Sequence, residues 1–517
     1  MKKTTLLLVA LLPLLTIIAQ KKNKTSEKFG NSITAADLKK HLYIVASADN
    51  EGRDTPSPGL EKAANYIEQH FRSIGLKPGN GDSYRLTYPL YKDSVLSSSV
   101  SVNGKSFELS KDYLNNNSNY TFELPSSEVV FAGYGIVDEK IDSYKDLDVR
   151  GKVVLIIEGT PADYKSAQTG NMSPGQTFGK LQSASKKGAI AVLLVSKSFG
   201  SSSSRPVSNR GGGWSLNGYK TNFNPLLFYI SERVAAEIMG EDGKGVFDKM
   251  GSNSLNGKSY KANIDLSFQK KNVTTYVSNV MGLLEGTDKK DEYVIITAHY
   301  DHVGKRNDTT IFYGADDDGS GTVSVLELAE AFVKAKAAGK GPRRSIIFMT
   351  VSGEEHGLWG SAYYSNNPVY PLEKTTVNLN IDMIGRIGND YMKDKDSANY
   401  IYVIGDNKLS SDLTPITENV NSTYTKLKLD RKYNDPKDPN RFYYRSDHYN
   451  FAQKGVPIIF YFNGVHPDYH RPTDTPDKIK YDLMEKRAKL VFYTALEMAN
   501  REEMLKRDVP LETQRAF

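Results

Sequence analysis

From residue 272 onward the sequence alternates between short apolar runs and helical patterns, and this alternation constrains the fold more than any other feature. A helical pattern at 320–336 follows the first run, and its apolar residues recur on one side. A strand, loop and helix rhythm of this kind predicts an α/β fold with a mixed, largely parallel sheet flanked by helices. The apolar runs that we expect to form its strands cover 293–298, 345–351, 377–381 and 456–462.

Side chains that can bind metals follow each of these apolar runs. Because the carboxyl ends of parallel strands meet at one edge of a sheet, we expect these side chains to lie close together. The chain has no cysteine, so a metal site here must use histidine and carboxylate ligands. The residues concerned are His299 and Asp301 after the first run, Asp317 before the helix, Glu354 and Glu355 after the second run, Asp382 after the third, and His470 after the fourth.

Each of these signals has an ordinary structural explanation when it stands alone. A single histidine after a strand is more often a hydrogen-bonded core or surface residue, and aspartate-rich turns are often helix caps. A calcium loop needs acids at alternate positions, and Gly314 occupies one of them. Five such loops at one sheet edge instead favour a metal site, and imidazole mixed with carboxylate oxygens favours zinc.

The amino terminus predicts export. Residues 1–20 have a basic start, a short apolar run and Ala19 near the end, which is typical of a secretory signal peptide. An uncleaved anchor is the weaker alternative, because Pro13 interrupts the run and the run is short for a spanning helix. No other stretch approaches spanning length. We therefore expect a periplasmic or extracellular protein with no membrane span after signal removal.

Length and charge limit the architecture and the partners. A chain of 517 residues predicts two domains. The segment 95–271 is rich in short β-like runs and reads as an insertion between two parts of an α/β domain, 25–94 and 272–517. Basic and acidic residues, 67 and 61 in number, are interspersed along the chain. No basic face for nucleic acid is therefore expected.

Several motifs together resemble peptidase family M28, a family of zinc aminopeptidases. They occur in the family's order and rough spacing, and an opening segment, ADNEGRDTPSPGLEKAANYI, is similar as well. Within the insertion, VVFAGYGI and GKVVLIIEG resemble the protease-associated (PA) domain that many members carry. The motifs that carry the family resemblance are HYDHVG, GADDDGSG, SGEE, NIDMIGR and GVHPDYHRPTDT.

The resemblance implies a ligand set for two zinc ions. His299 and Asp382 would bind one ion, Glu355 and His470 would bind the other, and Asp317 would bridge them. Every ligand position of the family pattern is occupied in this chain. Receptor-like relatives that keep the fold without activity have lost such ligands, so the intact set favours an enzyme.

The resemblance also implies catalytic roles beside the ligands. Glu354 matches the general base, and Asp301 would orient the ring of His299. Tyr469 and Arg445 would stabilise the carbonyl oxygen or the substrate backbone. Asp447 and His448 would support the loop that carries Arg445.

The expected activity is the removal of single residues from peptides with a free amino terminus. A carboxypeptidase, a dipeptidase or another amide hydrolase on the same metals is an alternative. Arg386 and Arg445 would be the first candidates for binding a substrate carboxylate in that case. A non-catalytic, receptor-like binding protein is the alternative from a different class.

Overall fold

The computed structural model describes residues 22–115, 121–166, 170, 172–196, 213–218, 225–246, 255 and 257–511. The expected signal peptide, residues 1–20, lies outside the described residues. The chain divides into two compact units, one formed by Met1–Tyr88 with Tyr276–Phe517 and the other by Pro89–Thr275. None of the helices in the described ranges combines the length and the apolar character needed to cross a membrane.

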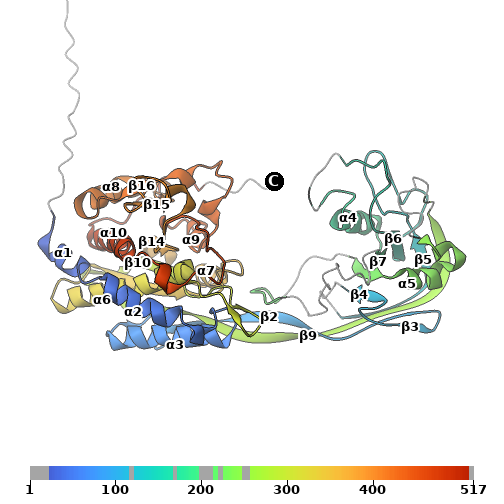
Figure 1. Ribbon diagram of the computed structural model, residues 1–517, viewed down its shortest axis with the longest axis horizontal. Helices are drawn as coiled ribbons and strands as arrows, with labels where there is room; N and C mark the ends of the chain where they lie inside the picture. The colour runs from blue at the N-terminus through green and yellow to red at the C-terminus, as the bar shows by residue number, and fades with distance from the viewer. Residues whose placement is uncertain are drawn as a thin grey trace, which may run out of the picture. The chain divides into compact units, whose positions relative to one another are not determined.

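The first unit is built on a twisted sheet with the strand order β16-β15-β17-β14-β10-β13-β9 (Figure 1). Strand β10 pairs in parallel with β13 and with β14, and β14 pairs in parallel with β17. Strands β9 and β15 pair antiparallel with β13 and β17. This topology confirms the mixed, largely parallel sheet. The strands are β9 (Lys258–Leu284), β10 (Lys289–His299), β13 (Arg344–Val351), β14 (Thr375–Ile381), β15 (Tyr400–Ile404), β16 (Lys428–Asp430) and β17 (Ile458–Phe462), with the short β1 (Lys77–Pro78), β11 (Lys305–Arg306) and β12 (Thr310–Ile311) beside them.

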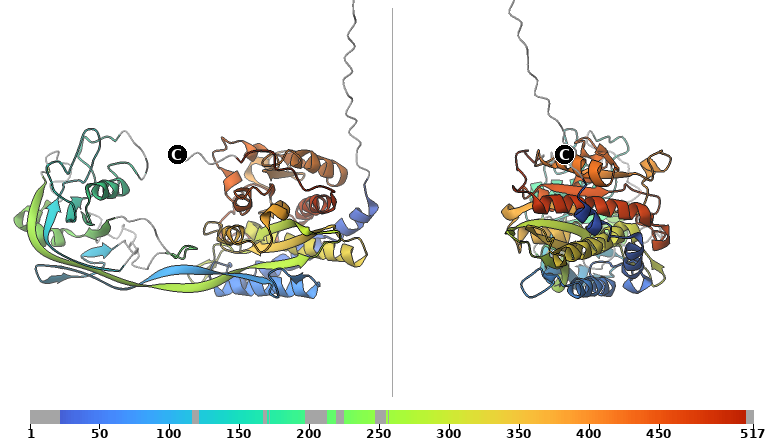
Figure 2. Two further views of the ribbon diagram at one scale, coloured as in Figure 1. Left: turned by 180° about the vertical axis from the view of Figure 1, so that it is seen from behind. Right: turned by 90° about the vertical axis from the view of Figure 1, so that its left-hand side faces the viewer.

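Helices cover both faces of this sheet. On one face α6 and α10 contact β10, β13 and each other, and α10 runs along the sheet as the long red helix of Figure 2. The ring of Phe332 on α6 lies 4.7 Å from that of Phe492 on α10 and 6.1 Å from that of Phe348 on β13. On the other face α7 and α9 join a core that includes Ile295 and Ile458. The helices are α1 (Lys24–Gly30), α2 (Ala35–Val45), α3 (Pro58–Ser73), α6 (Gly321–Ala337), α7 (Trp359–Asn366), α8 (Leu413–Tyr424), α9 (His448–Ala452) and α10 (Tyr481–Asn500).

Helix α3 shows how the local sequence determines an element. Ser57 caps it by accepting a hydrogen bond from the Leu60 backbone, and Pro58 occupies the first helical position. Gly75, with φ +83°, follows its end. The apolar residues of this helix share one buried face: Leu60, Ala63, Ala64, Ile67 and Phe71.

The second unit contains the segment 95–271. Strands β5, β6, β7 and β8 are parallel neighbours, and β9 and β4 pair antiparallel at the two sides. Helix α4 packs in the core on one face of these strands and α5 in the core on the other. The elements are β2 (Arg85–Val102), β3 (Lys105–Phe107), β4 (Tyr113–Asn115), β5 (Phe122–Phe131), β6 (Val153–Ile157), α4 (Thr177–Lys187), β7 (Ala191–Val195), β8 (Leu226–Ile230) and α5 (Glu232–Met239).

Candidate metal centre

The first unit brings the expected ligands to one edge of its sheet. His299 is the last residue of β10, and Asp382 follows directly after β14. Glu355 lies in the turn after β13, and His470 lies in the loop after β17. These four strands are parallel neighbours in the order β17-β14-β10-β13, so their carboxyl ends meet. Asp317 reaches the same place from the irregular turn η4 (Ala315–Ser320), which precedes α6.

The side chains of these residues form two adjoining groups that share Asp317. In the first group, His299 Nε2 lies 3.3 Å from Asp317 Oδ1 and 3.6 Å from Asp382 Oδ1. In the second, His470 Nε2 lies 3.0 Å from Asp317 Oδ2 and 3.1 Å from Glu355 Oε2. The two oxygens of one carboxylate thus face two different sets of donors.

The donor atoms fit divalent zinc. Ligand atoms at 2.0–2.1 Å from a tetrahedral zinc lie about 3.3 Å apart, and the four separations above are close to this value. Within the described part of the chain, His299 Nε2 and Asp317 Oδ2 are buried and make no hydrogen bond. Buried polar atoms without such partners are costly unless another group binds them. The set holds only nitrogen and oxygen donors, which suit zinc.

Each of the three consecutive aspartates has a different position. Asp318 accepts hydrogen bonds from the backbone of His299, Gly321 and Met383, at 3.1, 2.8 and 3.0 Å. Asp316 accepts one from the Gly385 backbone at 2.7 Å. The other oxygen of Asp316 lies 3.2 Å from His466 Nε2. Of the three aspartates, Asp317 faces His299 and His470.

The surrounding carboxylates control the charge of the histidines. Burial alone would lower the pKa of His299, but Glu354 and Asp382 raise it well above its ordinary value. Burial would likewise lower the pKa of His470, and its contacts with Asp317 and Glu355 raise it to about 10. Negative charge is therefore in excess at this edge, and divalent cations would offset it.

Glu354 lies beside the ligands without joining either group. Its Oε2 is 3.9 Å from His299 Nε2, and its side chain is 12% exposed. Burial and the negative charges of Glu355 and Asp382 raise the pKa of Glu354 well above its ordinary value. Its backbone N–H donates to Asp301 Oδ1 at 3.2 Å.

Asp301 contacts the His299 ring mainly through its main chain. His299 Nδ1 donates to the main-chain oxygen of Asp301 at 3.1 Å, whereas the carboxylate Oδ1 stands 3.6 Å away. That oxygen instead accepts the backbone N–H of Glu354. Asp301 therefore links the His299 loop to the Glu354 turn.

His302 is a residue of the site that the sequence reasoning left without a role. It is fully buried, and its Nδ1 lies 2.8 Å from Glu355 Oε1 and 3.7 Å from Asp317 Oδ2. His302, Asp317 and Glu355 together could hold a metal ion by their spacing. The sequence feature that could have identified His302 is its position in the same loop as His299. Among the described residues, neither of its ring nitrogens makes a hydrogen bond, so His302 is a further candidate ligand.

A small pocket opens beside the ligands. Tyr469 and Arg445 line it together with Glu354 and Asp382, and Arg445 Nη2 donates to the Tyr469 hydroxyl at 3.4 Å. Burial and the charges of Asp317 and Glu355 raise the pKa of Tyr469 above its ordinary value, so this phenol stays protonated. Asp317 also lines the pocket, and the apolar part of its wall consists of Met383, Phe442, Phe460, Phe462 and Val465.

The other charged residues considered from the sequence have structural partners. Arg386 pairs with Asp468 at 2.7 Å and with Asp474 at 3.5 Å. Asp447 Oδ1 accepts from the Ser361 hydroxyl. His448 donates from Nε2 to the Tyr443 carbonyl at 2.8 Å.

Comparison with known proteins identifies a peptidase family for part of the chain. Residues 279–495 match the model of peptidase family M28. A protein of Arthroderma otae named "Probable leucine aminopeptidase" is 33% identical over 216 residues, which cover 41% of this chain and 55% of that protein. An Arabidopsis thaliana protein named "Probable glutamate carboxypeptidase LAMP1" is 26% identical over 365 residues, covering 62% of this chain and 50% of that protein. The chain thus spans about half the length of these relatives.

One solved structure covers nearly the whole chain. The aminopeptidase from Aneurinibacillus sp. strain AM-1 aligns over 95% of this chain and 98% of its own, with 20% identity and a TM-score of 0.49. The family match confirms the M28 resemblance for residues 279–495. The PA-type nature of 95–271 stays a prediction.

Proposed function

We propose that this chain is a zinc metallopeptidase of the M28 type, a co-catalytic di-zinc exopeptidase that releases amino-terminal residues from peptides. The observation that carries the proposal is the position of Asp317, whose two oxygens face His299 on one side and His470 on the other. A carboxylate in this position can bridge two ions. The match of residues 279–495 to family M28 supports the same conclusion.

The proposed ligands form two half-sites, one for each zinc ion. His299 and Asp382 would hold one zinc, Glu355 and His470 the other, and Asp317 would bind both. When bound, such a pair of zinc ions makes water acidic near neutral pH and polarises the scissile carbonyl. Three carboxylates in the set would offset most of the charge of the two cations.

Glu354 provides the acid and base chemistry of the chain itself. It adjoins the ligand Glu355 but points toward the pocket, where it can take a proton from water and pass it to the leaving nitrogen. Burial and the neighbouring carboxylates raise the pKa of Glu354, which favours its acceptance of a proton. The protonated hydroxyl of Tyr469 can donate a hydrogen bond to the carbonyl oxygen of the substrate.

The pocket favours an apolar amino-terminal residue. Phe442, Phe460 and Phe462 offer an aromatic wall next to Glu354 and Asp382. An α-ammonium group is attracted to these carboxylates, and an apolar side chain can be buried against the rings. Arg386 is paired with Asp468, which removes one of the two arginines suspected of binding a substrate carboxylate.

A pair of adjacent substitutions tests the assignment. Glu354→Gln should keep the zinc content of the wild type and lower kcat by about two orders of magnitude or more, because a positioned base contributes roughly 10²–10⁴ in rate. Glu355→Gln is the matched control and should lower zinc content as well as kcat. If Glu354→Gln lost zinc to the same extent as Glu355→Gln, Glu354 would be a ligand and not the base. Zinc content and hydrolysis of an amino-acid anilide are the two measurements.

A carboxypeptidase is the second candidate, because Arg445 lines the pocket and one relative carries the name of a glutamate carboxypeptidase. Blocking each end of one good peptide substrate separates the two activities. For an aminopeptidase, acetylating the amino terminus should lower kcat/KM about a hundredfold, roughly 2.7 kcal/mol of transition-state binding. Amidating the carboxyl terminus should change little. The opposite pattern would establish the carboxypeptidase and identify Arg445 as its carboxylate-binding residue.

We further propose that the protein is exported and that the segment 95–271 is a PA-type domain. The basic and apolar pattern of residues 1–20 supports export. Mass spectrometry of the protein recovered from a secreting host would show a chain lacking these residues. A chain that retains residue 1 in the cytoplasm would contradict this proposal.

A further inference from the structure

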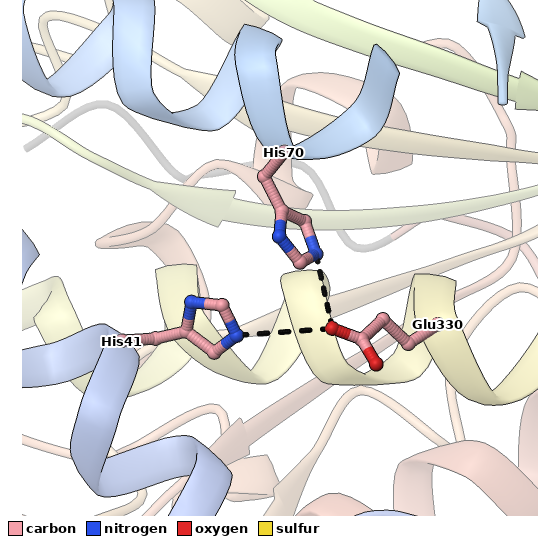
Figure 3. A group of neighbouring side chains, drawn as sticks. All are labelled: His41, His70 and Glu330. Carbon is pink, nitrogen blue, oxygen red and sulfur yellow. Dashed lines mark ion pairs between the residues drawn. The ribbon is translucent and has the colours of Figure 1, made fainter. Parts of the chain in front are cut away.

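A second cluster of metal-binding side chains lies away from the candidate active site, among three helices of the first unit. His41 comes from α2, His70 from α3, and Glu327 and Glu330 come from α6. Figure 3 shows His41 and His70 both pointing toward one oxygen of Glu330. His41, His70 and Glu330 each offer a ligand atom within 4.8 Å of the others.

The separations within this cluster fit ligands around a shared ion better than direct hydrogen bonds. His41 Nε2 lies 3.3 Å from Glu327 Oε1 and 3.9 Å from Glu330 Oε1, and His70 Nε2 lies 3.6 Å from Glu330 Oε1. Tetrahedral zinc ligands lie about 3.3 Å apart. Among the described residues, His70 Nε2 and both oxygens of Glu327 are buried and make no hydrogen bond. The Glu327 side chain is only 1% exposed.

The other atoms of the same side chains are already bound, which orients the cluster. His41 Nδ1 lies 2.7 Å from the Tyr66 hydroxyl, and His70 hydrogen-bonds to the Leu326 backbone. Lys334 donates to Glu330 Oε2 at 2.8 Å. A metal-bound histidine commonly donates its second ring nitrogen to a partner of this kind. These contacts leave both Nε2 atoms and Glu330 Oε1 for the common centre.

We propose that His41, His70, Glu330 and Glu327 bind a divalent cation of the zinc type. Two neutral imidazoles and two carboxylates carry two negative charges. Lys334 offsets part of the charge of Glu330, and a divalent ion would offset the rest in a buried place where charges need partners. The ion would join α2 and α3 to α6, the helix that begins at Gly321 directly after the turn that carries Asp317. The ion would therefore stabilise the packing of α6, the helix that follows the Asp317 turn. It would take no part in the reaction.

Zinc analysis of three variants tests the proposal. Wild type and variants are saturated with zinc, desalted, and analysed for zinc per chain. His70→Gln and Glu330→Gln should each hold about one equivalent less than wild type, melt several degrees lower in zinc, and keep kcat/KM near the wild-type value. Lys334→Gln is the matched control on the same helix, since it contacts the Glu330 oxygen that the site does not use, and it should keep the full zinc content. Equal zinc content in wild type, His70→Gln and Glu330→Gln would overturn the proposal and leave the cluster a buried ion-pair network.

The result does not depend on the proposed peptidase activity. Three equivalents in wild type, with one lost in His70→Gln, would support both metal proposals. Two equivalents with no loss in His70→Gln would support the active site alone. A single equivalent in wild type that is lost in His70→Gln would support the helix site alone. Should the variants fail to fold, wild-type crystals measured at the zinc absorption edge give the answer. An anomalous peak among His41, His70 and Glu330 is expected, and its absence in zinc-soaked crystals with peaks elsewhere would refute the site.

Discussion

Replacing Arg53 with methionine should destabilise the first unit more than any substitution of an exposed arginine. Arg53 is fully buried, and its guanidinium donates four hydrogen bonds to main-chain carbonyls. The acceptors lie at the end of α2, next to His299, and just before the turn of Asp317: Val45 at 3.0 Å, Tyr300 at 2.7 Å, Tyr313 at 2.9 Å and Gly314 at 2.9 Å. Methionine has a similar length but no donor.

The four contacts set the expected magnitude. A buried acceptor that loses its donor costs about 1–3 kcal/mol, so the lower end of this range gives about 4 kcal/mol for Arg53→Met. A loss of 1 kcal/mol lowers the melting temperature of a large domain by roughly 2–4 °C, and the total corresponds to about 10 °C. Zinc affinity should fall too, because the carbonyls of Tyr300 and Gly314 belong to the two loops that present His299 and Asp317.

Calorimetry of the metal-free and zinc-loaded proteins measures both effects. Arg72→Met is the matched control, since the Arg72 side chain is 64% exposed and pairs with Glu68 on the same helix; such a pair is worth about 1 kcal/mol at most. If Arg53→Met melted within a degree or two of Arg72→Met, the four carbonyls would have found other partners. The reasoning from unsatisfied acceptors would then be wrong.

Two further predictions concern metal removal and pH. A strong chelator should abolish peptidase activity and added zinc or cobalt should restore it, with no effect of thiol reagents because the chain lacks cysteine; full activity after prolonged chelation would contradict a metal mechanism. Burial lowers the pKa of His448 to about 3, so its unfolded form, with a pKa near 6.5, takes up a proton first as the pH falls. The stability that His448 contributes is thus present above pH 6.5 and is lost toward pH 3, about 2.5 kcal/mol of it between pH 7 and 4.5. Urea unfolding of the metal-free protein should show this loss in wild type and not in His448→Gln, and parallel pH curves for the two would refute it.

The order of the motifs allowed much of the site to be predicted. Apolar, β-branched runs form strands through local preference and burial, and parallel strands place their carboxyl ends at one edge. His299, Asp382 and Glu355 therefore had to meet once the sheet was parallel. Helix α3 could equally be predicted from the sequence. Ser57 and Pro58 mark its start, and its apolar residues recur with helical spacing.

The full length of strand β9 was harder to predict. Strand β9 runs over Lys258–Leu284 and alternates exposed and buried residues through a polar stretch. Its pairing with β5 and β13 is long-range, so its local sequence indicates only part of its length. A strand of this kind is stabilised by its neighbours more than by its own residues.

The sequence by itself determined which residues could bind metal, and the tertiary structure decided which atoms face each other. No spacing rule predicts that Arg386 pairs with Asp468, that His302 contacts Glu355, or that His41 and His70 converge on Glu330. Such contacts depend on how helices and loops distant in sequence pack, and on side-chain rotamers that packing selects. Local patterns specify strands and helices because they act between near neighbours. Which histidine each oxygen of the Asp317 carboxylate faces was determined only by the packing of β10, β17 and the turn before α6.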